Sequence, residues 1–328
     1  MGGTRWSDDH YKERERVRAK SGKATFEHDD DVRAGRTAAK VHQKLNPHGV
    51  KVRESRDSEA HPTAHGVSVL FDVTGSMQAV PQILQKNLPR LMGLLLRKGY
   101  LEHPAIMVGA IGDATCDAAP LQLGQFESGI EIENDLTNIY LEGGGGESIT
   151  ESYELAMYFM ARHTVMDCFE KRGKRGYLFI VGDEIPYAKL KREEVERVLG
   201  DTLQADIPIE QLVAELTRTF DVYFILPHMT SNYNNPMILK RWSELLPQRV
   251  LRLEEPAGIC ELIASTVGIA EGVVDIADLE RDLKEAGSTP TIVQAVGNAV
   301  APVARRAAGK AVDVAVPASG KGSGIAKL

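Results

Sequence analysis

The chain has 328 residues, of which 43% are hydrophobic and 26% are charged, as in an ordinary soluble globular protein of one large or two modest domains. Its net charge of −7 gives no general reason to expect binding to nucleic acid or to a membrane. The three cysteines are far apart in the sequence, and there is no apolar signal-peptide core or bilayer-spanning segment. We therefore expect a cytoplasmic protein without a disulfide framework.

Residues 1–62 form a charged N-terminal arm with few large apolar side chains. The pattern predicts a charged helix over 8–20 and a weakly amphipathic helix over 29–45. The charged segment 53–62, which ends in proline, is expected to be a linker into the main domain. Such low apolar content leaves two alternatives, an arm that is partly disordered or one that is docked on the domain.

From residue 63 to residue 270, short apolar segments alternate with segments of helical periodicity. The expected strands are 66–73, 105–113, 121–129, 176–184, 221–227 and 249–254. The expected helices are 78–99, 147–164, 209–220, 236–247 and 257–270. This alternation predicts an α/β domain with a doubly wound, mostly parallel six-stranded sheet and helices on both faces. A helical C-terminal extension over 271–310 and a flexible tail over 311–328 are expected to follow.

Polar residues stand where three of these strands end, and ligands of open parallel sheets bind beyond the carboxyl ends of the strands. A glycine run, 143–146, opens the helix expected after the second and third strands. The polar residues at these ends are Asp72, Thr74 and Ser76, then Asp113, then Asp183 and Glu184, with Glu147 and Ser148 after the glycines. Carboxylates and hydroxyls without histidine or thiolate suit Mg²⁺, Mn²⁺ or Ca²⁺ better than zinc. The carboxylate of a protein partner would fill an open position on such an ion.

The segment "DVTGSM" resembles the D-x-S-x-S element of von Willebrand factor A (VWA) domains, with Thr74 in place of the first serine. In that family, a threonine and an aspartate from two further loops complete a metal-ion-dependent adhesion site (MIDAS). The resemblance places the aspartate on Asp183, and it places Glu147 where the threonine would stand. It covers roughly residues 64–270 and implies a Rossmann-like sheet in the order 3-2-1-4-5-6, with one antiparallel edge strand.

The resemblance further implies a bacterial intracellular adaptor or scaffold that binds a protein partner through magnesium and has no catalytic activity. The expected metal residues are therefore Asp72, Thr74, Ser76, Glu147 and Asp183, with Ser148 and Asp113 as additional candidates. Several family members of this kind act beside AAA+ ATPases of the MoxR type, so such an ATPase is an expected partner by analogy.

A Mg²⁺-dependent phosphotransferase or phosphatase is the alternative, because "DVTGS" also resembles motifs in which the aspartate is phosphorylated. Asp72 would then be the nucleophile. Phosphatases of that type use a second aspartate two residues later as a general acid, whereas this chain has Thr74 there. The sequence therefore favours the binding protein over the enzyme.

Overall fold

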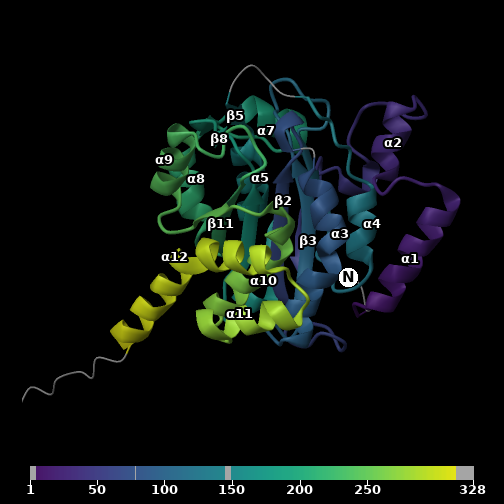
Figure 1. Ribbon diagram of the computed structural model, residues 1–328. Coiled ribbons are helices and arrows are strands. Elements are labelled where there is room, and N and C mark those ends of the chain that lie inside the picture. Colours follow the sequence, from purple (N-terminus) through teal and green to yellow (C-terminus); the bar gives the residue numbers. More distant parts are fainter. Residues whose placement is uncertain (1–4, 78, 145–148, 315–328) are drawn as a thin grey trace, which may run out of the picture.

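The computed structural model describes residues 5–77, 79–144 and 149–314 (Figure 1). The helices are α1 (Asp8–Ser21), α2 (Glu27–Arg33), α3 (Val80–Met92), α4 (Glu131–Thr137), α5 (Tyr153–Arg162), α6 (Asp167–Glu170), α7 (Arg192–Leu199), α8 (Ile209–Leu216), α9 (Pro236–Leu245), α10 (Ile259–Ala270), α11 (Ile276–Glu285) and α12 (Pro290–Val314). The strands are β1 (Arg53–Ser55), β2 (His65–Asp72), β3 (Pro104–Ile111), β4 (Leu121–Leu123), β5 (Thr150–Glu151), β6 (Thr164–Met166), β7 (Gly176–Val181), β8 (Ile185–Pro186), β9 (Lys189–Leu190), β10 (Ile207–Pro208), β11 (Phe220–Pro227) and β12 (Val250–Leu253).

The centre of the molecule is a six-stranded sheet in the order β12-β11-β7-β2-β3-β4. Its neighbouring strands run parallel, except that β4 is antiparallel to β3 at the edge. If the six strands β2, β3, β4, β7, β11 and β12 are numbered 1 to 6 by their order in the chain, the sheet order read from the β4 edge is 3-2-1-4-5-6. The predicted mixed α/β architecture and its antiparallel edge strand are therefore confirmed.

Side chains of the central strands alternate between two buried cores, one on each face of the sheet. Val69 and Phe71 of β2 pack in the core that also contains residues of α3, α10 and α12. Leu70, between them, packs in the core that contains residues of α5, α8 and α9. Helices thus cover both faces, and β2 is buried along its whole length, as a central parallel strand requires.

The N-terminal arm lies against the main domain beside α3 and α4 (Figure 1). The buried Tyr11 hydroxyl donates a 2.7 Å hydrogen bond to the carbonyl of Gln85 on α3. Arg18 forms an ion pair of 2.5 Å with Glu133, a fully buried carboxylate of α4. The segment 53–62, expected to be only a linker, begins with β1, which pairs in parallel with β6.

The region after the glycine run differs from the predicted helix over 147–164. Residues 145–148, which include Glu147 and Ser148, lie outside the described residues. Thr150 and Glu151 form β5, which pairs in parallel with β8, and α5 begins only at residue 153. The partner strand comes from a distant part of the chain, so local periodicity carried no signal of this pairing.

The C-terminal extension consists of α11 and α12, and α12 continues to Val314, past the predicted start of the tail at residue 311. Its first half packs on α10 and α11, and its far end projects from the body of the molecule (Figure 1). Among the helices that the structure describes, none is long and apolar enough to cross a membrane.

Candidate metal centre

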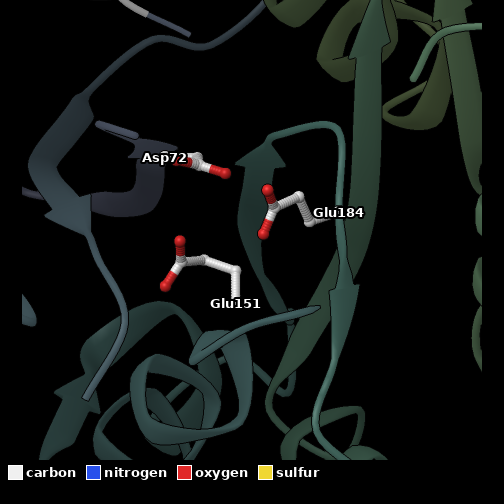
Figure 2. A group of neighbouring side chains, drawn as sticks. All are labelled: Asp72, Glu151 and Glu184. Atoms are coloured by element: carbon white, nitrogen blue, oxygen red, sulfur yellow. The ribbon is translucent and has the colours of Figure 1, made fainter. Parts of the chain in front are cut away.

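Three carboxylates converge at the carboxyl-terminal edge of the sheet. Asp72 is the last residue of β2, Glu151 is the last residue of β5, and Glu184 lies between β7 and β8. Each offers one carboxylate oxygen, and these oxygens lie within 4.8 Å of one another. Figure 2 shows the three carboxyl groups pointing toward a common space.

Hydrogen bonds on both of its oxygens hold the Asp72 side chain in place. The amide and hydroxyl of Thr74 donate to Oδ1 at 2.7 and 2.5 Å. The hydroxyl of Tyr153, at the start of α5, donates to Oδ2 at 2.8 Å. Both Asp72 and Tyr153 have no solvent exposure, so the orientation of this carboxylate is fixed before any ligand arrives.

Gly182 makes room for the Tyr153 hydroxyl at the end of β7. A Cβ atom built on Gly182 would lie 2.1 Å from that hydroxyl oxygen, which no packed structure tolerates. The glycine before Asp183 is thus required by the contact between Tyr153 and Asp72. In the sequence motif "VGDE", Gly182 therefore has a steric role, in addition to the negative charges that Asp183 and Glu184 supply.

Burial and neighbouring negative charges raise the pKa values of all three carboxyl groups. Desolvation raises the pKa of Asp72 to about 6, although the bonds from Thr74 and Tyr153 oppose the shift. Desolvation and the charge of Asp72 raise the pKa of Glu151 to about 10 and that of Glu184 to about 8. Negative charge is therefore costly at this site, and a bound cation would relieve the cost.

The donor set fits a hard cation on chemical grounds. Its three ligand atoms are all carboxylate oxygens, which Mg²⁺, Mn²⁺ and Ca²⁺ prefer. Glu184 is partly exposed, whereas the other two carboxylates are buried. These residues could hold a divalent ion.

The structure brings some of the predicted metal residues together. Asp72 is one of the three donors, and Thr74 orients it. The backbone of Ser76 lies in a 3₁₀ turn over Gly75–Met77 beside the site. Asp183 is fully buried, and its negative charge raises the pKa values of Asp72 and Glu184, but it is not one of the three converging donors.

Asp113, an additional candidate, holds the loop after β3 in place. Its Oδ1 accepts a 2.8 Å hydrogen bond from the amide of Thr115, and its Oδ2 accepts a 2.9 Å bond from the hydroxyl of Tyr187. Ser152 also donates to Oδ1 at 3.4 Å. Asp113 is therefore a neighbour of the centre that organises the loop, outside the group of three donors.

Two donors were absent from the metal set predicted from the sequence. Glu184 directly follows Asp183 at the end of a strand, and this position could have indicated that Glu184 is a ligand. Glu151 had no such signal, because the helical pattern placed it inside a predicted helix, whereas it lies on a short strand paired with β8.

Neither a protein-family profile nor a curated protein sequence matches this chain. Among solved structures, similar folds include the open form of the pilus adhesin SpaC from Lactobacillus rhamnosus GG, with 8% identity, a TM-score of 0.44 and coverage of 62% of this chain and 30% of that one. Proximal thread matrix protein 1 from the mussel byssus has 8% identity and a TM-score of 0.40, over 67% and 48% of the two chains. A von Willebrand factor type A protein from Catenulispora acidiphila has 14% identity and a TM-score of 0.37, over 64% and 43%. The matched region thus spans between about a third and half of each of those chains, and at these scores the likeness carries no argument about function.

Proposed function

We propose that this chain is a cation-dependent protein-binding module. Asp72, Glu151 and Glu184 hold one divalent cation, Mg²⁺ or otherwise Mn²⁺ or Ca²⁺, in a MIDAS-like position at the end of the sheet. The observation that carries the proposal is the convergence of their three oxygens within 4.8 Å. A cation bound there supplies a coordination position for an oxygen atom of a protein partner.

The other residues of the centre act on the donors. Thr74 and Tyr153 keep Asp72 oriented, so little side-chain entropy is lost when a cation binds. Asp183 adds a buried negative charge next to Asp72, which attracts a cation further. Ser76, Glu147 and Ser148 remain predicted contributors from the adjacent loops.

The charge of the centre constrains the partner group. A divalent ion among three carboxylates carries a net charge of about −1, so a fourth carboxylate would meet repulsion. This favours an uncharged partner oxygen, such as a hydroxyl, amide or backbone carbonyl, over the aspartate or glutamate expected from the sequence. A bacterial intracellular adaptor that works with a MoxR-type AAA+ ATPase is the setting that the VWA resemblance implies.

The environment of Asp72 also favours binding over phosphoryl transfer. The residue two positions later, Thr74, donates its hydroxyl proton to Asp72 and has no acidic proton to give to a leaving group.

One set of titrations tests the proposal. Mg²⁺ and Mn²⁺ are titrated calorimetrically into the wild-type chain and into Asp72→Ala, and the same samples are assayed with a generic phosphate ester. The proposal predicts cation binding by the wild type, none by the variant, and no hydrolysis by either. Hydrolysis by the wild type that disappears in the variant would establish the enzyme instead.

A further inference from the structure

The N-terminal arm is bonded to the loop that borders the candidate metal centre. Asp29, on α2, accepts a 3.1 Å hydrogen bond from the amide of Leu141 through its Oδ1. Arg33, one turn later, donates a 2.6 Å hydrogen bond to the carbonyl of the same residue. The two side chains are joined to each other by an ion pair of 2.7 Å. Both backbone groups of Leu141 are thus held by side chains of the arm, an arrangement that we call the Leu141 clamp.

Leu141 is followed directly by residues that are bonded to the loop carrying Thr74. The amide of Gly143 donates to the carbonyl of Val73 at 3.1 Å, and the carbonyl of Gly144 accepts from the amide of Gly75 at 2.7 Å. Val73 and Gly75 flank Thr74 on both sides. Residues 141–144 therefore help to position the turn that orients Asp72.

The same short segment is also fixed from a third direction. The carboxylate of Glu142 accepts hydrogen bonds from the amides of Ala118 and Ala119, at 2.8 and 3.0 Å. Residues 141–144 thus form a junction between the arm, the loop after β3 and the turn after β2.

Burial indicates that the acidic half of the clamp is built into the packing, whereas the Arg33 side chain is 56% exposed. Asp29 is 9% exposed, although it lies in an arm that is otherwise rich in exposed charge. A buried carboxylate needs partners, and its partners here are Arg33 and the Leu141 amide. The neighbouring pair Asp30 and Arg36, on the same arm, is exposed on both side chains and bonds only within the arm.

We propose that the Leu141 clamp makes the arm a positioning element of the metal centre, so that cation binding and docking of the arm support each other. This inference rests on the proposed function, since it concerns the same cation. The clamp fixes residues 141–144, these hold the turn over 73–75, and that turn holds Asp72. Because coupling between two binding events is reciprocal, a cation at the centre must also stabilise the docked arm.

The test compares two double variants of the full-length chain. Asp29→Ala with Arg33→Ala removes the clamp, and Asp30→Ala with Arg36→Ala removes an exposed pair of the same charge from the same arm. Mn²⁺ affinity is measured by calorimetry, and the thermal midpoint is measured separately in EDTA. Changes to groups that hold a metal ligand directly weaken affinity by roughly 10–100-fold, so this more remote contact is expected to weaken it by about three- to tenfold. The control pair should bind as the wild type does.

Hydrogen exchange on the wild-type chain supplies a readout that does not depend on the folding of the clamp variant. Mn²⁺ is expected to slow exchange of the α2 amides and of the Leu141 amide, and to have no such effect in Asp72→Ala. If the double variant fails to fold, Arg33→Ala alone replaces it, because the Arg33 side chain is 56% exposed and its loss removes the bond to the Leu141 carbonyl.

The outcomes separate this inference from the proposed function. Weaker binding in the clamp variant alone, with Mn²⁺-dependent protection of α2, supports the coupling. Wild-type affinity in a folded clamp variant, or unchanged exchange of α2 in a chain that binds Mn²⁺, overturns the coupling and leaves the proposed function standing. No Mn²⁺ binding by the wild type overturns both.

Discussion

The hydroxyl of Tyr153 donates a 2.8 Å hydrogen bond to Oδ2 of Asp72, which joins the first residue of α5 to the last residue of β2. Both residues are completely buried. The contact leaves Asp72 with a fixed orientation and lowers the cost of its charge in a dry environment. It therefore makes Tyr153 a residue through which the properties of the metal centre can be changed without touching a donor.

Tyr153→Phe is expected to weaken cation binding without unfolding the protein. Loss of the hydroxyl removes a hydrogen bond that favours the ionised form of Asp72, so the pKa of Asp72 rises above its present value of about 6. Protons then compete better with the cation, and the loss of Mn²⁺ affinity should be larger near pH 6 than near pH 8. Calorimetric titrations at the two pH values measure this difference.

Tyr158→Phe is the matched control, because the Tyr158 hydroxyl lies on the same helix and donates to Asp201 at 2.9 Å. Each variant should lose about 1 kcal/mol of stability, the usual contribution of one hydrogen bond. A pH-independent loss of affinity in Tyr153→Phe, or the same loss in Tyr158→Phe, would contradict the assigned role of the Tyr153 hydroxyl.

Gly182→Ala should damage both stability and the centre. The added methyl group would stand 2.1 Å from the Tyr153 hydroxyl, so the ring must move away from Asp72. Overpacking of a buried position costs about 1–3 kcal/mol, and chemical denaturation measures it.

Gly297→Ala, the control, adds its methyl where nothing lies within 4 Å. It removes a helix-interior glycine and should stabilise the protein by about 0.5–1 kcal/mol. Equal effects of the two substitutions would show that the steric account of Gly182 is wrong.

The sequence predicted the residues whose position depends on local pattern. Asp72, Asp113 and Asp183 follow apolar strands, and the rule that polar residues gather at the carboxyl ends of parallel strands placed them near one edge. Glu151 required knowledge of the pairing between β5 and β8, which joins residues more than thirty positions apart. The Leu141 clamp could not be predicted from local pattern either, because Asp29 contacts Leu141 across 112 positions of the chain.

The pKa shifts predict how the stability of the cation-free protein depends on pH. A carboxyl group whose pKa is raised by folding, such as Glu151 to about 10 and Glu184 to about 8, binds its proton more tightly in the folded state. Its contribution is therefore most favourable below the unfolded pKa and is lost as the pH rises toward the folded pKa. In EDTA, Glu151→Gln should thus gain stability relative to the wild type as the pH rises from about 5 to about 9. Urea denaturation at several pH values measures this, and a constant difference would contradict the shifted pKa of Glu151.

Excess Mn²⁺ should narrow that difference at high pH, because bound cation stabilises each chain in proportion to the logarithm of its affinity and the wild type binds the cation more tightly. The wild type should therefore gain more stability from Mn²⁺ than Glu151→Gln does. Equal gains in the two proteins would show that Glu151 is not a ligand.

The most direct measurement is a calorimetric titration of Mn²⁺ into the wild type, Glu151→Gln and Glu154→Gln at one pH. Glu154 is a completely buried carboxylate close to Glu151 in the chain and outside the group of three donors, and burial keeps its pKa well above the usual range. We predict one Mn²⁺ per chain for the wild type and for Glu154→Gln, and an affinity at least about tenfold weaker for Glu151→Gln, as loss of a charged ligand requires. Absence of binding by the wild type, or equal affinities for all three proteins, would contradict the metal centre.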